Sequence, residues 1–473
     1  MDWDIVIGLE VHVQLNTETK AFCSCKVNYG DAPNTNVCPV CLGYPGSLPV
    51  LNKELVNSAI KLGLATHCSI RPFSKFARKN YFYPDLPKGY QISQYDDPIC
   101  YEGYVDIEVD GNQKRIGLTR IHMEEDAGKS MHSESGTLVD LNRCGTPLLE
   151  IVSEPDMSSP QEAYAYLTTL KQIVRYTGVS DCNMEEGSMR CDANISIKPK
   201  GQKEFGTRTE LKNMNSFRNV ERALIYEAKR QQEVLESGGT IVQQTLLWDE
   251  QRGKTKTMRS KEDSHDYRYF PEPDLSPVYV DEAWIEKIKK TLPEMPAERK
   301  QRFIDSFDFK TEDAATLTSE KEIADYFEET LKHINDPKLV LNWVRNEILR
   351  ILVDTGTDMS NPPVLPKALS ELLVFLNKKE ITAQTAKAIL DDMASTGKSA
   401  EIIIDEKGLK QISDSSALED MIDQILAENE ENVKRFRDGE SKLLGFFIGQ
   451  VMRGTQGKAD QALTREIILK KLG

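Results

Sequence analysis

Three polar side chains near the start of the chain are spaced to share one face of a β-strand. In the segment 4–15, DIVIGLEVHVQL, apolar residues follow one another at every second position from Ile5, so Glu10, His12 and Gln14 fall on the other side. A carboxylate and an imidazole two residues apart on one face could bind a metal ion or assist phosphoryl transfer. The alternative is the solvent-facing side of an antiparallel sheet.

The same alternation recurs farther along the chain, which favours a functional face over a solvated one. It is present in the segments 119–126, 148–154, 189–197 and 207–212, and the first of these ends in three successive acids. The polar residues that would share faces are Glu150 with Glu154; Arg190 with Asp192, Asn194 and Ser196; and Arg208 with Glu210 and Lys212. Acids, Arg, His and Asn are the side chains that hold Mg²⁺ and phosphate.

Four of the nine cysteines form a pattern typical of a metal site. Cys23 and Cys25 precede Cys38 and Cys41, with a polar, turn-rich loop between the two pairs that could not fold by burial alone. Four thiolates on two turns suit a tetrahedral structural Zn²⁺ and leave no open position for a catalytic zinc. Unrelated cysteines are the alternative, and the other five cysteines are expected to be small core residues.

Length and composition indicate an ordinary globular protein of several domains. The 473 residues exceed what one hydrophobic core supports, and no apolar run reaches the 18 residues of a membrane helix. The first strand begins at once, without room for a signal or transit peptide, so we expect a cytoplasmic protein. A net charge of −15 restricts any contact with nucleic acid to a local patch.

The organisation along the chain predicts an α+β fold. Residues 1–292 are rich in strands, with helices expected at 51–65, 160–176 and 216–237, and form one large domain. After the proline pair at 293 and 296 the strand pattern gives way to helices. We therefore predict an all-helical domain over 293–400 and a small helical tail domain over 401–473, whose last part is basic.

Several long blocks of the sequence are similar to one known family. These blocks are 7–12 (IGLEVH), 78–94 (RKNYFYPDLPKGYQISQ), 147–156 (PLLEIVSEPD), 186–194 (EGSMRCDAN), 208–213 (RTELKN), 266–271 (DYRYFP) and 449–453 (GQVMR). The chain thereby resembles the B subunit of the glutamine-dependent aspartyl/glutamyl-tRNA amidotransferase. The resemblance spans nearly the whole chain and is far more specific than a short motif.

This resemblance implies a fold, an activity and partners. The fold would be a β-rich cradle similar to glutamine synthetase, followed by the helical and tail domains. The activity would be ATP-dependent amidation of mischarged Asp-tRNA(Asn) or Glu-tRNA(Gln) through a phosphorylated side-chain carboxylate. The partners in a heterotrimer would be the family's amidase (glutaminase), which releases ammonia from glutamine, and a small third protein that ties the assembly together.

Phosphoryl transfer between two anions needs a divalent cation and fixed positive charge, which assigns roles to the predicted strand faces. For Mg²⁺ we choose Glu10, His12, Glu125 and Glu150, with Asp192 as a further group for phosphoryl transfer. Choosing Glu125 over Glu124 assumes a bulge or a strand end, because strict alternation places Glu124 beside Arg120 and His122. The residues expected to bind ATP phosphates and their surroundings are Arg190, Arg208, Glu210 and Lys212.

Two further regions receive expected roles in handling the tRNA. The loop 79–94 would form a lid or ammonia gate near the acceptor end, with Lys79 and Tyr81 as contacts; without the resemblance, an ordered surface loop is the simpler interpretation. In the tail, the cations expected to contact the tRNA backbone are Arg453, Lys458, Arg465, Lys470 and Lys471.

Two other function classes compete with this hypothesis. A non-catalytic tRNA-binding scaffold would need none of the acids for chemistry, and a stand-alone ligase that amidates a small acid would work without tRNA. The basic tail and the two helical domains favour a macromolecular substrate. The sequence does not distinguish Asp-tRNA from Glu-tRNA as substrate.

Overall fold

The computed structural model describes residues 2–133, 136–258, 267–409, 415–455, 459 and 461–473. The chain divides into two compact units, Met1–Pro296 and Ala297–Gly473. The first unit mixes strands and helices, and the second is built from helices, so the predicted α+β class is confirmed.

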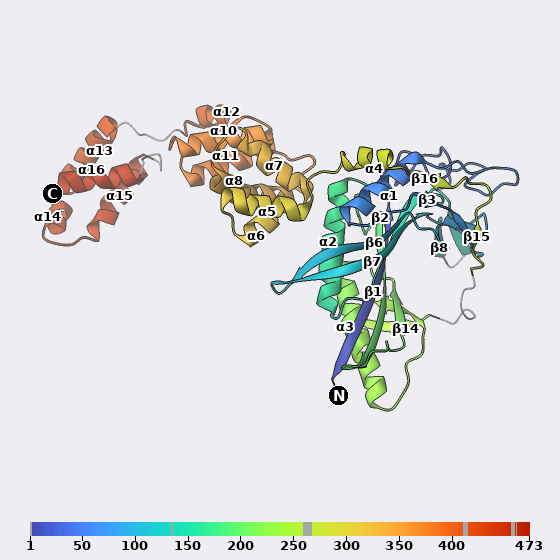
Figure 1. Ribbon diagram of the computed structural model, residues 1–473. Helices are drawn as coiled ribbons and strands as arrows, with labels where there is room; N and C mark the ends of the chain where they lie inside the picture. The colour runs from blue at the N-terminus through green and yellow to red at the C-terminus, as the bar shows by residue number, and fades with distance from the viewer. Residues whose placement is uncertain (1, 134–135, 259–266, 410–414, 456–458, 460) are drawn as a thin grey trace. The chain divides into compact units, whose positions relative to one another are not determined.

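A nine-stranded sheet forms the centre of the first unit (Figure 1). Its order is β14-β13-β12-β11-β1-β10-β7-β6-β2, and neighbouring strands are antiparallel except for β12 and β13. The strands are β1 (Trp3–Gln14), β2 (Ser69–Ile70), β6 (Cys100–Val109), β7 (Asn112–Glu125), β10 (Pro147–Ser153), β11 (Met189–Pro199), β12 (Thr209–Lys212), β13 (Thr245–Asp249) and β14 (Lys254–Thr257).

The alternation of β1 decides which side of the sheet becomes the core. Ile7, Leu9, Val11 and Val13 are completely or almost completely buried and belong to the hydrophobic core of this unit. Helices α2 (Pro160–Thr177) and α3 (Phe217–Glu236) lie along the same side of the sheet in Figure 1, and α3 contacts β11. The polar residues of β1 therefore occupy the opposite face.

Local signals fix the ends of these helices. Helix α1 (Lys53–Ala65) begins after Asn52, whose side chain accepts a hydrogen bond from the Glu54 amide. Ser159 caps α2 in the same way, and Gly178 ends it in the left-handed conformation that a side chain disfavours. A fourth helix, α4 (Glu282–Lys289), completes the unit. Cys68, Cys100, Cys144, Cys182 and Cys191 are buried, as expected.

Short strands form three small sheets around the large one. The sheet β15-β4-β5 is the most important for the site, because it carries the segment that was expected to form a lid. The strands are β4 (Ala77–Asn80), β5 (Tyr90–Ser93) and β15 (Phe270–Pro271); β3 (Phe73–Ser74) and β16 (Val278–Tyr279); and β8 (Lys129–Ser133) and β9 (Gly136–Asp140).

The second unit contains only helices among its described residues, and these pack into two hydrophobic clusters. One cluster runs from Phe303 to Ile404 and the other from Leu418 to Leu472. The helices are α5 (Pro296–Phe307), α6 (Thr311–Thr318), α7 (Lys321–Leu331), α8 (Pro337–Trp343), the π-helix η1 (Val344–Ile348), α9 (Leu349–Thr355), α10 (Pro366–Asn377), α11 (Ala383–Thr396), α12 (Ala400–Lys407), α13 (Ser415–Glu428), α14 (Glu430–Arg437), α15 (Leu443–Gly454) and α16 (Gln461–Leu472).

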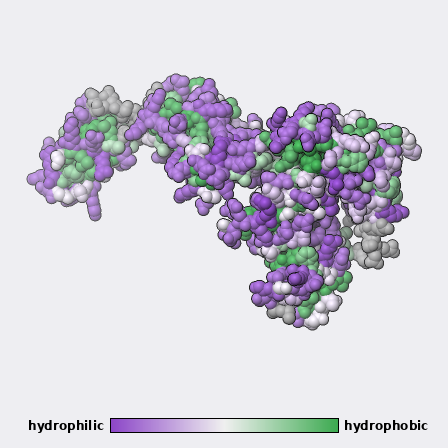
Figure 2. All heavy atoms as spheres, viewed as in Figure 1, coloured by the Kyte–Doolittle hydropathy of each residue, from purple (hydrophilic) through white to green (hydrophobic). Residues whose placement is uncertain are grey.

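Two separate clusters in the second unit support the predicted division into 293–400 and 401–473, which stays a prediction. Hydrophilic residues cover most of the visible face of the chain (Figure 2), in keeping with its charge. Over the described residues, no helix has the length and apolar character needed to cross a bilayer.

Candidate metal and phosphate site on the polar face of the sheet

Antiparallel pairing places four polar residues in one row across four adjacent strands. His122 of β7 is opposite Glu150 of β10, Glu150 is opposite His12 of β1, and His12 is opposite Arg190 of β11. Directly opposite residues project to the same face with their Cβ atoms about 5 Å apart. The sheet itself therefore brings together residues that are distant in the sequence.

The centre of this row is a compact group of possible metal ligands. One ligand atom from each of His12, Glu124 and Glu150 lies within 4.8 Å of the other two. Nε2 of His12 is 3.2 Å from Oε2 of Glu150, and Nε2 of His122 is 3.1 Å from Oε1 of Glu124. Glu124 and Glu150 are both buried.

The structure brings Glu124, and not the predicted Glu125, together with His12 and Glu150. Strand β7 continues without irregularity to its last pair, Glu125 opposite Pro147, and the register shift in this part of the sheet falls between Val152 and Ser153 instead. Glu125 therefore projects to the other face. There its carboxylate forms an ion pair with Lys88 and accepts a hydrogen bond of 2.9 Å from the Ile92 amide.

Two buried residues of β5, which the sequence pattern alone did not reveal, hold Glu124 in place. Ser93 Oγ donates to Oε1 of Glu124 at 2.6 Å, and Gln91 Nε2 donates to Oε2 at 3.1 Å. His122 was also not chosen. Gln91 and Ser93 are two residues apart in an alternating segment, and that spacing was the signal that could have identified them as sharing a face.

The charges of this group act strongly on one another. Burial alone would raise the pKa of Glu150, but the charges of His122 and His12 outweigh it and lower that pKa. Burial likewise opposes protonation of His12, yet its hydrogen bond with Glu150 leaves the His12 pKa raised. The pKa of Glu10 is raised by burial and by repulsion from Glu150. A divalent cation held by the carboxylates would relieve this repulsion.

Arg190 extends the row into a second group of charges. Its Nη2 lies 3.0 Å from both carboxylate oxygens of Asp126, and Gln14 Nε2 donates to the same carboxylate at 2.7 Å. Burial opposes ionisation of Asp126, but Arg190 and Arg143 lower its pKa overall. Nε of Arg190 is buried and has no hydrogen-bond partner among the described residues.

Lys212 joins the acids of β11 and β12. It forms ion pairs with Asp192 and, at 2.9 Å, with Oε1 of Glu210, and despite burial the charges of these two acids raise its pKa. Glu10 accepts a hydrogen bond of 3.1 Å from Asn194, one strand away. Arg208 lies just before β12 and is exposed, and its charge helps to lower the pKa of Glu210.

Lys79 and Tyr81 lie close enough to the row to respond to its charges. Burial would lower the pKa of the Lys79 ammonium, but the charge of Glu124, with smaller contributions from tyrosines and Glu150, raises it overall. Burial raises the pKa of Tyr81, with a further contribution from Glu124. Lys79 Nζ is 5.0 Å from the ring centroid of Tyr267. Lys79 of β4 thus places a positive charge near the acidic group.

A second cluster has the composition of a structural metal site. The sulfur atoms of Cys23, Cys25, Cys38 and Cys41 all lie within 4.8 Å of one another, as the spacing predicted. A hydrogen bond from Cys23 lowers the pKa of Cys41, whereas burial raises that of Cys25 to about 11. Four sulfurs this close cannot all ionise without a cation, and a tetrahedral metal fits the donor set.

The tail cations that were expected to contact the tRNA differ in their exposure and ion pairing. Arg453 on α15 and Arg465 and Lys470 on α16 are exposed. Lys471 is half-buried and forms an ion pair with Asp423 of α13. Lys458 lies outside the described residues.

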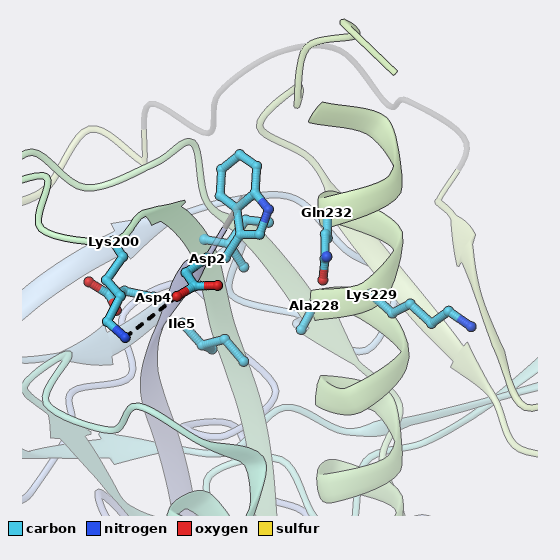
Figure 3. A pocket seen from close by; sticks show the side chains of 9 residues that line it. Asp2, Asp4, Ile5, Lys200, Ala228, Lys229 and Gln232 are labelled. Carbon is cyan, nitrogen blue, oxygen red and sulfur yellow. Dashed lines mark ion pairs between the residues drawn. The ribbon is translucent and has the colours of Figure 1, made fainter. Parts of the chain in front are cut away.

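A pocket at the start of β1 is unrelated to these clusters. It lies between this strand and α3, lined by residues including Trp3, Ile5 and Lys229, and Lys200 forms an ion pair with Asp2 beside it (Figure 3). None of the predicted site residues lines it.

The fold and the clusters define an α+β protein in which one sheet face carries a group of possible metal ligands with cationic side chains beside it. Residues 5–286 match the family described as the GatB/GatE catalytic domain, and residues 325–472 match the GatB domain. The chain belongs to the family of the B subunit of aspartyl/glutamyl-tRNA(Asn/Gln) amidotransferase.

Full-length relatives carry that name. The protein from Thermoanaerobacter pseudethanolicus is 54% identical over 473 residues, which is 100% of both chains. The one from Carboxydothermus hydrogenoformans is 53% identical over 476 residues, covering 100% of this chain and 99% of the relative. The one from Thermodesulfovibrio yellowstonii is 54% identical over 473 residues, again 100% of both chains.

Proposed function

We propose that this chain is the subunit that activates and amidates a mischarged tRNA. The substrate is Asp-tRNA(Asn), Glu-tRNA(Gln) or both, and the product is Asn-tRNA(Asn) or Gln-tRNA(Gln). The convergence of His12, Glu124 and Glu150 beside Arg190 is the observation that carries the proposal. An acid-rich face with an adjacent guanidinium suits the meeting of a nucleotide phosphate with a carboxylate.

The chemistry takes place in two displacements. In the first, an oxygen of the amino acid's side-chain carboxylate attacks the γ-phosphorus of ATP, the bond to the β-phosphate oxygen breaks, and ADP leaves. In the second, the nitrogen of ammonia attacks the acyl carbon, the bond from that carbon to the phosphate oxygen breaks, and inorganic phosphate leaves with one proton of the ammonia, so that the amide remains. The first step converts a poor leaving group, oxide, into a good one.

The residues of the polar face have distinct parts in this proposal. His12, Glu124 and Glu150, with Glu10 nearby, would hold Mg²⁺, which neutralises phosphate charge and polarises the transferring group. Arg190, Arg208 and Lys212 would bind phosphate oxygens, and the ion pairs of Lys212 with Asp192 and Glu210 would set its position. Lys79 and Tyr81, which lie near the acidic group, would contact the reacting carboxylate.

The remaining assignments are also proposals that rest on family membership and on chemistry. We infer a glutamine-synthetase-like cradle for the first unit and Zn²⁺ for the four-cysteine site. Ammonia would come from a partner amidase (glutaminase), and a small third protein would complete a heterotrimer in the cytoplasm. Arg453, Lys458, Arg465 and Lys470 would contact the tRNA backbone.

The test combines the chain with both partner proteins, mischarged tRNA, glutamine, ATP and Mg²⁺, and measures amidated aminoacyl-tRNA. We expect no product when ATP or tRNA is omitted, and ammonium to replace glutamine. We expect Glu10→Gln and Glu150→Gln to abolish most activity while tRNA binding persists. Full activity in both variants would favour a non-catalytic scaffold, and amidation of a free acid without tRNA would favour a stand-alone ligase.

A further inference from the structure

The four-cysteine site has a buried cation beside it that neither the family match nor the proposed function uses. Lys20 is completely buried. Its Nζ donates to the backbone carbonyls of Asn36 at 2.7 Å and Leu141 at 3.3 Å, and lies 3.7 Å from Sγ of Cys41. These three neighbours match the three hydrogens of an ammonium group.

A buried ammonium needs a compensating negative charge, because burial without one is very costly. Among the described residues no carboxylate forms an ion pair with Lys20, and the nearby Glu125 already has Lys88 as its partner. A divalent metal bound by four thiolates has a net charge of −2. The thiolate cluster is therefore the group in reach that can balance Lys20, and Lys20 offsets half of the cluster's excess charge.

The cysteine segment is also hydrogen-bonded to the polar face of the sheet. The Ala21 amide donates to the Gly145 carbonyl at 2.8 Å, and the Gly145 amide donates to the Asp126 carbonyl at 2.8 Å. The Asp126 amide in turn donates to Thr146 at 2.8 Å. The side chain of Asp126 binds Arg190, so a continuous series of hydrogen bonds leads from the residue after Lys20 to the phosphate site.

Gly145 has a backbone conformation that favours glycine, and it lies beside the stem of Lys20. Its φ is +86°, and a Cβ added there would lie 3.4 Å from Cδ of Lys20 and 3.8 Å from Oε2 of Glu125. The segment that follows β9 therefore packs directly on the stem of Lys20, while Leu141 accepts from its ammonium group. Lys20 therefore contacts this segment both at Leu141 and at Gly145.

We propose that Lys20 is a positioning residue that supplies the counter-charge for a metal held by the four cysteines. Through the segment 141–146, the neutralised site fixes Asp126 and hence the direction of Arg190. The first half concerns metal binding alone, and the second half rests on the proposed function of Arg190.

The first experiment measures metal affinity. Full-length chain is titrated with Zn²⁺ in competition with a chromophoric chelator, and folding of each variant is checked by circular dichroism. We expect Lys20→Gln, which keeps a donor but removes the charge, to bind zinc roughly 10-fold or more weakly, as changes beside metal ligands do. Lys26→Gln, an exposed lysine of the same segment, is the matched control and should bind as the wild type does.

Lys20→Arg retains the positive charge at this position. It therefore gives a second measurement that does not depend on whether Lys20→Gln folds. Its zinc affinity should stay closer to that of the wild type than to that of Cys41→Ser. Unchanged affinity in folded Lys20→Gln, or an equal loss in Lys20→Arg and Lys20→Gln, would overturn the proposed counter-charge.

The second experiment follows the hydrogen-bond series without measuring activity. Amide hydrogen exchange is compared in the wild type before and after zinc removal. The amides of Gly145 and Asp126 should exchange faster without metal, whereas those of Val105 and Ile107 in β6 should not change. Equal exchange of Gly145 and Asp126 in both states would overturn the link to the sheet, whatever the outcome of amidation assays.

A kinetic arm then tests the consequence for Arg190. With zinc saturating, Lys20→Gln should raise KM for ATP more than it lowers kcat, because ATP phosphates would meet a displaced guanidinium. Lys26→Gln should leave both unchanged. An unaltered KM, together with faster exchange at Asp126, would reject the role of Arg190 and leave the metal proposal standing.

Discussion

Nε2 of His12 lies 3.2 Å from Oε2 of Glu150, directly across the pairing of β1 with β10. Both side chains take their direction from the sheet, so their distance depends on strand register and not on a loop. A shift of one residue in that register would send Glu150 to the apolar face. The site is therefore built on the centre of the sheet, which suits the proposal that this group holds a cation between two carboxylates.

Glu124 and Glu125 should differ in their effects on the reaction. We expect Glu124→Gln to lower the rate of ATP-dependent phosphorylation by roughly 100-fold or more, because a ligand of the proposed metal site is lost. The measurement is ADP release in the assembled enzyme, with thermal unfolding as the control. Glu125→Gln should instead lower the unfolding temperature, since it leaves Lys88 buried without its partner. The reverse pattern would restore Glu125 as the ligand.

Ser93 should act on the reaction through Glu124. Ser93→Ala removes the 2.6 Å hydrogen bond to Oε1 of Glu124, and we expect a loss of roughly 10-fold in apparent Mg²⁺ affinity. Activity is measured as a function of Mg²⁺ concentration. The loss should be recovered at high Mg²⁺, and Ser93→Thr should retain most of the affinity. A Mg²⁺ dependence equal to that of the wild type would show that Glu124 needs no such support.

The exposed cations of the tail should contribute more to tRNA binding than the paired one. Arg465→Gln and Lys470→Gln should each make the slope of log affinity against log salt concentration shallower by about one, the amount expected for the loss of one phosphate contact. Lys471→Gln is the matched control with a smaller effect, because Lys471 already pairs with Asp423. Filter binding over a series of salt concentrations gives the slopes.

Removal of the tail after Gly439 tests the same surface as a whole. It should weaken tRNA binding at physiological salt and leave zinc content unchanged, because the four cysteines belong to the first unit. Unchanged tRNA affinity in the truncated chain would remove the assignment of the tail.

The helical unit should lose stability on acidification. Arg299, which is almost completely buried, pairs with Glu328 and, at 2.7 Å, with Asp325. Burial opposes ionisation of both acids, but their hydrogen bonds to basic partners lower the pKa of Glu328 below its ordinary 4.5 and that of Asp325 below 3.8. The two ion pairs therefore stabilise the folded state fully at a pH above the ordinary pKa of each acid. This stabilisation is lost as the pH falls through the lower pKa values that the acids have in the folded state.

Urea unfolding between pH 7 and pH 3 measures this effect. The wild type should lose more stability over this range than Glu328→Gln, whose residue 328 cannot be protonated. Equal losses in the two proteins would show that the Arg299 pairs do not govern acid sensitivity.

Much of the fold follows from local pattern. The alternation around Glu10 and His12 identified β1 and its polar face, and Pro160 at the first turn marked the start of α2. The spacing of the cysteines identified a group that the structure brings together. These features depend only on the spacing of residues along the chain. The repeat of apolar and polar residues in a strand or helix matches the repeat of its backbone, so it predicts which face each side chain occupies.

The position of Glu124 beside His12 and Glu150 could not be obtained in this way. Glu124 and Glu125 are adjacent and of the same residue type, and the sequence pattern favoured Glu125 only on the assumption of a bulge at that strand end. The register shift falls instead in the middle of the β7–β10 pairing, where Val152 is opposite Arg120 and Ser153 is opposite Leu118. Where a bulge forms depends on pairing across the sheet, which a single strand's sequence does not contain.

The sequence by itself determined the alternating strands, the four-cysteine spacing and the family to which the chain belongs. Only the tertiary structure decided that β10 and β11 flank β1, that Gln91 and Ser93 hold Glu124, and that Lys20 lies against Cys41. The physical reason is that periodicity along a chain sets which way a side chain points, whereas its partner is set by register and burial between segments that are far apart in sequence.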